Sequence, residues 1–175
     1  MTAKHTIYFI LTGGTIDSYY EGIKDTAVPN KHSVIPRFIR GLRLPNKAVF
    51  NEICMKDSRS LNKKDLLNIL KVVVKAPPQS KIIVTHGTYT MADTARFVKA
   101  NLKQKNKTII FTGSFIPLDG FTFSDAPFNL GFAIAKAEEL PAGVYVCMNG
   151  RVFSSDEAIK IISQGAFESI FGENK

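Results

Sequence analysis

The sequence predicts an α/β fold in which helices cover both faces of a mostly parallel sheet, giving three layers. Apolar runs rich in β-branched residues alternate along the 175 residues with longer segments whose apolar positions recur at helical spacing. Strands that alternate with helices in this way form parallel sheets through right-handed crossovers. The strands expected in the sheet are residues 6–11, 48–55, 81–85, 107–112 and 144–148.

The first half of the chain begins with a buried strand that ends at Gly13-Gly14. The polar segment 17–32, which contains two tyrosines, is expected to form a mobile loop of the kind that often acts as a lid. Residues 34–42 have helical spacing. Asn62 is expected to cap a further helix that ends at Lys75. The side chains expected on the inward face of that helix are Leu66, Leu67, Leu70, Val73 and Val74.

The second half continues the alternation, with a helix expected over residues 92–102 between two strands. Ser124-Asp125 is expected to cap the next helix. Asn149-Gly150 is a strong signal for a β-hairpin, here a small one over residues 143–154. The tail from Asp156 onward is expected to be weakly helical.

Composition and charge indicate one globular domain, which we expect to span residues 1–175 without a carboxy-terminal domain. The net charge is +8, but the lysines and arginines are dispersed at helical spacing, so we expect solvated faces and no nucleic-acid partner. The charge favours an anionic substrate. Because no apolar run is long enough to span a bilayer and no secretory signal is recognised, we expect a cytoplasmic protein with no membrane partner.

No motif predicts a cofactor or a metal. The turn Gly13-Gly14-Thr15-Ile16-Asp17 lacks the Gly-x-Gly-x-x-Gly spacing of a dinucleotide site, and no P-loop lysine follows it. The three histidines lack ligand spacing. Cys54 and Cys147 lie in apolar stretches and are expected to be buried, reduced thiols.

Two threonine-containing turns follow expected strands: Thr12-Gly13-Gly14-Thr15-Ile16 and His86-Gly87-Thr88-Tyr89-Thr90-Met91. Because loops at the carboxyl ends of parallel strands bind ligands in α/β folds, the two turns are expected to share one site. The hydroxyl groups of Thr15 and Thr88 then suggest a nucleophile and its helper. Each has a plainer alternative: Thr15 could bond to its own turn, and Thr88 could cap the following helix.

Together the two turns resemble signatures of the L-asparaginase family, which has Thr-Gly-Gly-Thr-Ile near the amino terminus and His-Gly-Thr-Asp-Thr-Met after a central strand. Further segments resemble the family in the same order: residues 57–61, 112–117 with 124–130, and 143–149. The resemblance covers nearly the whole chain and corresponds to the amino-terminal domain of two-domain enzymes. It implies a Rossmann- or flavodoxin-like sheet.

The resemblance implies hydrolysis of the side-chain amide of L-asparagine to L-aspartate and ammonia, through an acyl-enzyme and without a cofactor. It implies Thr15 as the nucleophile, assisted by Tyr20 or Tyr19, with Thr88 and Lys160 as a second polar cluster. A serine and an arginine would hold the substrate carboxylate, and N–H groups of the glycine turns would hold the oxyanion. The implied substrate-binding residues are Gly14, Ser58, Arg59, Gly87 and Tyr89.

Tyr89 departs from the family pattern, which has an aspartate that contacts the α-amino group of the substrate. A phenol is uncharged at neutral pH and cannot neutralise an ammonium. Asp17, Glu21 and Asp119 are the candidates to replace that carboxylate. An amidohydrolase acting on another small amide, or a non-catalytic module that binds an amino acid or metabolite, therefore stays an alternative.

The expected partners are a small amide substrate and further copies of the chain, as a homodimer or homotetramer. In the two-domain enzymes the site is completed by the smaller domain of a neighbouring subunit. The apolar residues Phe167, Ile170 and Phe171 near the end of the chain suit either an interface or the core.

Overall fold

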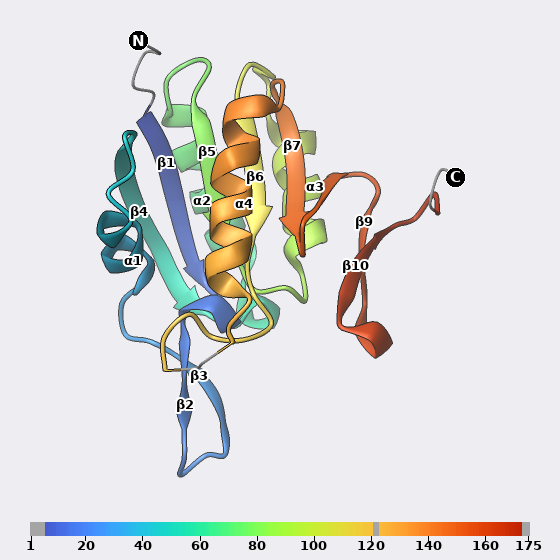
Figure 1. Cartoon of the computed structure of the whole chain (residues 1–175). Helices are drawn as coiled ribbons and strands as arrows, with labels where there is room; N and C mark the ends of the chain where they lie inside the picture. Colours follow the sequence, from blue (N-terminus) through green and yellow to red (C-terminus); the bar gives the residue numbers. More distant parts are fainter. Residues whose placement is uncertain (1–5, 121–122, 173–175) are drawn as a thin grey trace.

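The computed structural model describes residues 6–120 and 123–172, and these residues form a three-layer α/β/α fold (Figure 1). Six strands of the described part form the central sheet, in the order β4-β1-β5-β6-β7-β8. Adjacent strands are parallel except β8, which is antiparallel to β7. This confirms the predicted fold class. The strands are β1 (Thr6–Gly13), β4 (Lys47–Lys56), β5 (Lys81–Thr85), β6 (Thr108–Thr112), β7 (Gly143–Met148) and β8 (Arg151–Ser154).

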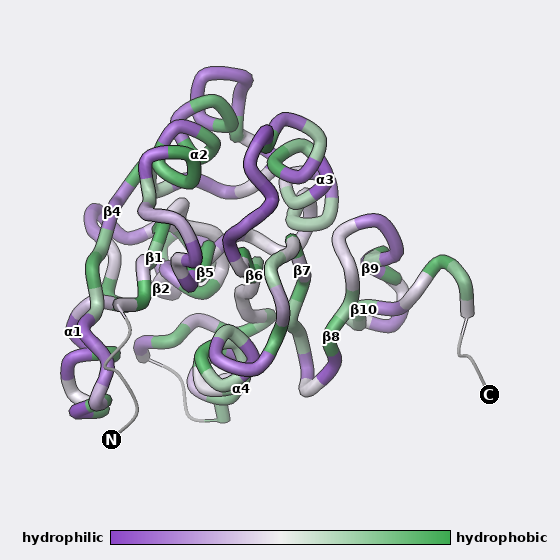
Figure 2. Tube along the Cα trace, turned by 90° about the horizontal axis from the view of Figure 1, so that it is seen from above, coloured by the Kyte–Doolittle hydropathy of each residue, from purple (hydrophilic) through white to green (hydrophobic). Residues whose placement is uncertain are grey.

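Helices cover both faces of the sheet, as the view along the strands shows (Figure 2). The helices α2 (Lys63–Lys75) and α3 (Met91–Asn101) lie on one face, and α1 (Ile35–Gly41) and α4 (Ala126–Glu139) lie on the other. Side chains of a strand alternate between the two faces, so neighbours on β5 enter different cores. Burial on both faces explains why the strands read as nearly continuous apolar runs.

The helix α2 begins at its predicted cap. The Asn62 side chain accepts hydrogen bonds from the N–H groups of residues 64 and 65, and Asp65 bonds back to the Asn62 N–H, which forms a capping box. The predicted inward face is partly wrong, because Leu67 and Val74 are 47% and 53% exposed, whereas Ile69 is fully buried. Leu67 and Val74 lie nearly half a turn around the helix from Ile69, which is at the centre of the buried stripe.

Turn predictions near the end of the sheet have a mixed outcome. Asn149 and Gly150 both have positive φ and join β7 to β8, so the hairpin is confirmed. The helix after Ser124-Asp125 is also confirmed, but the Asp125 side chain does not cap it. Its carboxylate instead accepts hydrogen bonds from the N–H groups of Phe115 and Ile116, which fixes the loop after β6.

The segment 17–32, expected to form a mobile loop, contains a β-hairpin. Its strands, β2 (Ser18–Glu21) and β3 (Thr26–Pro29), pair in an antiparallel fashion and project below the carboxyl ends of the sheet in Figure 1. The β propensity of its tyrosines, threonine and valine outweighed the turn signals of the glycine and proline. Each strand pairs only four residues, and the segment is polar, so no strand pattern stands out in its sequence.

The tail is also not helical. After β8 it forms a second hairpin from β9 (Ala158–Ile161) and β10 (Ala166–Ser169), joined through Gly165 in the left-handed conformation. Residues 158–161 alternate in environment, with Ala158 buried and Ile159 40% exposed, which is the two-residue period of a strand. The isoleucines of this stretch favour strand over helix.

The β9–β10 hairpin is fixed against α3. Arg96 of α3 donates hydrogen bonds to the carbonyl groups of Ser155 and Ala158, at 3.4 and 3.0 Å. Phe167 is 2% exposed and belongs to the core beside α3, whereas Ile170 and Phe171 are exposed. Of the three apolar residues expected either in an interface or in the core, Phe167 alone therefore lies in the core.

The two cysteines differ in burial. Both are free thiols, and Cys147 is buried as expected, but Cys54 is only half-buried. Burial raises the pKa of the Cys54 thiol to about 11, so the thiolate form is scarce at neutral pH.

Two glycine turns touch at the carboxyl end of the sheet. Gly14 follows β1 with φ 81° and ψ −178°, a conformation that only glycine adopts readily. A Cβ atom at Gly14 would overlap the backbone N and Cα atoms of Gly87, which follows β5. The Gly14 N–H also donates to the carbonyl of Lys56 at 2.8 Å. The exits of β1, β4 and β5 are thus packed backbone against backbone.

We expect Gly14→Ala to lower the free energy of unfolding by about 3 kcal/mol or more, because backbone strain and overlap with Gly87 add together. Gly22→Ala is the matched control: its Cβ would meet nothing within 4 Å, and its φ is not positive. We expect that variant to stay within about 0.5 kcal/mol of the unmodified protein. Urea denaturation measures both, and equal stability of the two variants would contradict the packing described.

Candidate active site

A cavity of about 210 Å³ lies at the carboxyl ends of the sheet strands, where the sequence places the threonine turns. Loops after β1, β4 and β5 form its walls, and β9 closes one side. It brings together every predicted site residue except Tyr20. The residues that line it are Gly14, Thr15, Asp57, Ser58, Arg59, Gly87, Thr88, Tyr89 and Lys160.

Hydrogen bonds across the strand ends hold these turns in place. Thr12 Oγ1 donates to the carbonyl oxygen of Thr85 at 2.8 Å, which ties the end of β1 to the end of β5. Thr90 Oγ1 donates to the Ser58 carbonyl at 3.0 Å, and the Thr90 N–H donates to Ser58 Oγ at 3.4 Å. The serine is therefore buried and oriented by the turn after β5.

The two predicted threonines have different surroundings. Thr15 begins the short 3-10 helix η1 (Thr15–Asp17) and is half-buried, and its hydroxyl makes no hydrogen bond within residues 6–120 and 123–172. Thr88 is 6% exposed, and its Oγ1 accepts a hydrogen bond of 2.7 Å from Lys160 Nζ. The helix after β5 has Thr90 as its N-cap, so Thr88 does not cap it. One hydroxyl is thus open to the cavity, and the other is paired with an amine.

Lys160 reaches this site from β9, far along the chain from the turns it joins. Its Nζ lies 5.1 Å from the ring centroid of Phe115 and 6.0 Å from that of Tyr89. Burial lowers the pKa of Lys160, the nearby Arg59 cation lowers it further, and Asp57 opposes the shift. The amine is therefore easier to deprotonate than that of a solvated lysine.

Arg59 is already paired. Its Nε and Nη2 donate to the two carboxylate oxygens of Asp57 at 2.9 and 3.0 Å, and its backbone N–H donates to the same side chain. This bonding to Arg59 lowers the pKa of Asp57. The guanidinium carbon lies 5.5 Å from the ring centroid of Tyr89. The fork expected to bind a substrate carboxylate is thus largely used within the site.

The tyrosines of the β2–β3 hairpin do not line the cavity. Tyr20 is 51% exposed, and its hydroxyl donates to Asp25 on the same hairpin. Tyr19 is 42% exposed and donates to Glu21 at 3.1 Å.

None of the carboxylates proposed to replace the family aspartate lines the cavity. Asp17 is buried and accepts hydrogen bonds from Ser33 Oγ and the Val34 N–H, and burial raises its pKa. Asp119 forms an ion pair with Arg37 at 2.6 Å. Glu21 stays on the β2–β3 hairpin. The carboxylate that does line the cavity is Asp57.

Asp57 and Phe115 are site residues that sequence reasoning missed. Asp57 precedes Ser58 in a segment already singled out, and an Asp-x-Arg sequence is compatible with a local ion pair, so a signal existed. Phe115 follows β6 and meets Lys160 only through the fold. Nothing in its local sequence indicates that contact.

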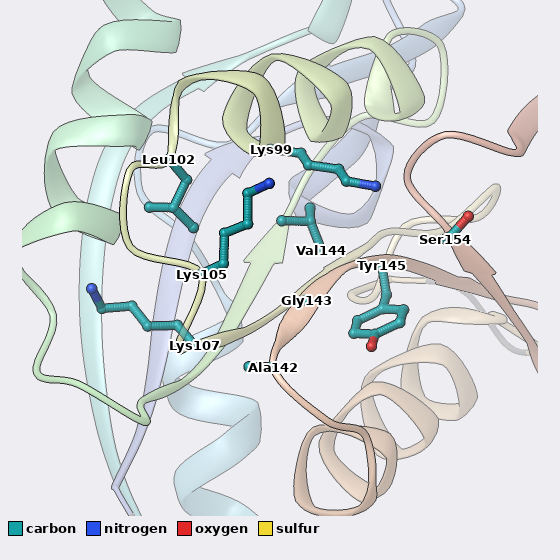
Figure 3. A pocket seen from close by; sticks show the side chains of 9 residues that line it. All are labelled: Lys99, Leu102, Lys105, Lys107, Ala142, Gly143, Val144, Tyr145 and Ser154. Atoms are coloured by element: carbon teal, nitrogen blue, oxygen red, sulfur yellow. The ribbon is translucent and has the colours of Figure 1, made fainter.

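A second cavity, of about 270 Å³, lies at the opposite end of the sheet near the start of β6 and β7 (Figure 3). It is lined by Lys99, Lys105 and Lys107 together with apolar residues. The figure shows the Lys107 amine turned away from that of Lys99, and it donates to the Val74 carbonyl at the end of α2 at 3.4 Å. This cavity contains no predicted site residue.

Within residues 6–120 and 123–172, no cluster of His, Cys, Asp or Glu side chains could hold a metal ion. None of the helices found there has the length and apolar character needed to cross a membrane.

Comparison with known proteins relates most of the chain to one family. The family model described as "Asparaginase, N-terminal" matches residues 6–172. The glutaminase-asparaginase of Acinetobacter glutaminasificans is 29% identical over 170 residues, which cover 91% of this chain and 51% of that protein. The glutaminase-asparaginase of Pseudomonas fluorescens biotype A is 35% identical over 184 residues, which cover 98% of this chain and 50% of that protein.

Solved structures agree with this relationship. The crystal structure of L-asparaginase I from Vibrio cholerae matches with a TM-score of 0.82 and 25% sequence identity, over 95% of this chain and 52% of that one. The chain therefore spans about half the length of the relatives it matches.

His86, beside the site, should make stability depend on pH. It is fully buried, its Nδ1 lies 2.8 Å from the Gly87 carbonyl oxygen, and burial lowers its pKa from 6.5 to about 4. Because the unfolded chain then binds a proton more readily than the folded one, stability is complete above pH 6.5 and falls as the pH drops towards 4.

We expect this histidine to account for a loss of about 3 kcal/mol in the free energy of unfolding over that pH range. His86→Gln keeps a donor for the Gly87 carbonyl but does not titrate, so its stability should fall less between pH 6.5 and 4. Urea unfolding at a series of pH values measures the difference. Parallel pH curves for the two proteins would refute a buried neutral histidine.

Proposed function

The chain belongs to the asparaginase family, and from that premise we propose that it hydrolyses the carboxamide group of a small amide. The names of its relatives indicate L-asparagine as the substrate, which would give L-aspartate and ammonia. We propose that the reaction passes through an ester on a threonine side chain and uses no cofactor. We also propose that the protein acts in the cytoplasm.

The observation that supports this proposal most strongly is the arrangement inside the cavity. The Thr15 hydroxyl, unpaired among the described residues, and the Thr88 hydroxyl, bonded to Lys160 at 2.7 Å, belong to residues that line the same space of about 210 Å³. A threonine hydroxyl is a weak nucleophile until a base takes its proton. A lysine with a lowered pKa, connected to the cavity through a second hydroxyl, is a group that can accept and return that proton.

In the proposed first half-reaction, Thr15 Oγ1 forms a bond to the amide carbon and gives its proton to the Thr88–Lys160 pair. The C–N bond then breaks, the nitrogen receives a proton and leaves as ammonia, and an ester remains on Thr15. In the second half-reaction a water molecule attacks the ester carbon and loses its proton to the same pair. The ester C–O bond breaks, which releases the carboxylate product and restores the Thr15 hydroxyl.

Other residues would bind the substrate. Gly14 and Gly87 line the cavity, and N–H groups of their turns other than that of Gly14, which is bonded to the Lys56 carbonyl, would stabilise the oxyanion that forms at the amide oxygen. The Ser58 hydroxyl would hold the substrate carboxylate, with Arg59 next to it. Tyr20 has a role in this scheme only if the β2–β3 hairpin moves towards the cavity.

We propose that the chain works as a homo-oligomer. Ile162, Ile170 and Phe171 of the tail are 67%, 53% and 72% exposed, which is unusual for large apolar side chains close together in sequence. A contact between copies through the β9–β10 hairpin would cover them and would hold Lys160 in place.

We expect Thr15→Val to lower kcat for ammonia release by at least about a thousandfold, because the variant has no nucleophile. The shape of the side chain is kept, so its free energy of unfolding should stay within about 0.5 kcal/mol of the unmodified protein. Thr26→Val, on the exposed strand β3, is the matched control and should keep full activity. Activity of Thr15→Val close to that of the control would rule out Thr15 as the nucleophile.

A wild-type protein that binds an amide substrate but releases no ammonia from L-asparagine, L-glutamine or other small amides would instead support a non-catalytic binding module.

The pH dependence of kcat/KM should report Lys160. As the proton acceptor it must be neutral, so kcat/KM should rise with pH, through a pKa below that of an ordinary lysine. Arg59→Gln removes a cation that lowers the pKa of Lys160. It also frees the Asp57 carboxylate from its ion pair with Arg59, and this carboxylate raises the pKa of Lys160. The rising limb should therefore move to higher pH. A limb that does not move, or moves to lower pH, would contradict the assignment of Lys160.

A further inference from the structure

The charged groups that line the cavity are unbalanced. Among the described residues they are two cations, Arg59 and Lys160 in its protonated form, and one carboxylate, Asp57. Both oxygens of that carboxylate accept hydrogen bonds from Arg59. Lys160 donates to a hydroxyl group, not to a carboxylate. A carboxylate in the cavity would therefore meet uncompensated positive charge, whereas an ammonium would meet only a carboxylate that Arg59 already holds.

The Tyr89 ring does not offer an ammonium a free site either. Its ring lies within cation–π distance of both Arg59 and Lys160, at 5.5 and 6.0 Å from the ring centroid. The electron-rich ring is thus already shared by two cations of the site. A third cation placed against it would be repelled by both of them at close range.

Hydrogen-bond donors for an anion are available. The Ser58 hydroxyl is buried in the cavity wall, and the Nη1 group of Arg59 has no acceptor within the described ranges. Arg59 could therefore hold an anion with Nη1 while Nε and Nη2 keep Asp57. The net charge of +8 for the whole chain attracts the same kind of ligand.

We propose that the cavity selects small amides that carry a carboxylate and no ammonium group, namely monoamides of short dicarboxylic acids, over amides of amino acids. This inference rests on the proposed amide hydrolysis and names its substrate class. L-asparagine would be a poorer substrate than succinamate, which has the same carboxylate and the same amide but lacks the α-ammonium. The bonds made and broken are the same for both compounds.

The first test uses the unmodified protein and the two product ligands. Succinate and L-aspartate differ only in the ammonium group, so calorimetry of each at moderate salt concentration isolates its effect. We expect succinate to bind about tenfold more tightly or better, because the ammonium of L-aspartate would be left without a hydrogen-bond partner, and an unpaired charged group usually costs at least that much. L-aspartate binding as tightly as succinate, or no detectable binding of either ligand at millimolar concentration, would overturn the proposal.

The second test changes the charge at one position. Tyr89→Asp adds a carboxylate between the two cations, and should shift the ratio of kcat/KM for L-asparagine to that for succinamate towards L-asparagine by about tenfold or more. Tyr89→Phe removes only the hydroxyl and should leave that ratio unchanged. An unchanged ratio in folded Tyr89→Asp would overturn the proposal. If this variant does not fold, the calorimetric comparison decides.

The two proposals fail separately. Preference of the unmodified protein for L-asparagine over succinamate would overturn the selectivity and leave amide hydrolysis standing. Release of ammonia from neither amide, together with tighter binding of succinate than L-aspartate, would overturn the hydrolysis and support the selectivity.

Discussion

The contact between Gly14 and Gly87 is the constraint on which the site depends. The two turns approach so closely that no side chain fits between them, and each follows a different strand of the sheet. The same close packing continues to Ser58, because a Cβ atom at Gly87 would lie 2.8 Å from the Ser58 side chain. Three strand exits are therefore held in fixed relative positions by their backbones. This rigidity places the hydroxyl groups of Thr15 and Thr88 on one small cavity without relying on flexible loops.

The remaining part of the site comes from the end of the described chain. Lys160 lies on the β9–β10 hairpin, which sits beside the sheet and not within it (Figure 1). The hairpin is fixed by Arg96 and by the buried Phe167, which lies 6.4 Å from Phe115 between ring centroids. Because Phe115 also contacts Lys160, the packing of the tail and the position of the amine are coupled. A change in this packing would alter the site without touching a residue of the threonine turns.

The fold was largely predictable because its signals are local. The apolar strands, the Asn62 cap and the Asn149-Gly150 turn each depend on neighbouring residues, and all three are confirmed. Errors arose where packing decides the outcome. Leu67 and Val74 are exposed because the inward stripe of α2 is narrower than its apolar content suggests. The two short hairpins were missed because each pairs only four residues per strand, too few for a clear periodic pattern.

Most of the site could be located from two motifs at strand ends, because ligand sites in parallel sheets collect at that edge. The charge pairing within the site could not be predicted from the sequence. Whether Arg59 is free or paired depends on rotamers of adjacent side chains, and the contact of Lys160 with Phe115 joins residues far apart in sequence. The replacement of an aspartate by Tyr89 was visible in the sequence, but its consequence required knowing that two cations flank the ring.

The central claim is that one threonine hydroxyl carries the acyl group while the other serves the proton-accepting lysine. Rapid acid quenching during turnover of an amide substrate, followed by peptide mapping in a mass spectrometer, tests it most directly. The scheme predicts an ester at Thr15 and none at Thr88. An ester located at Thr88, or rapid turnover with no ester at either position, would contradict it.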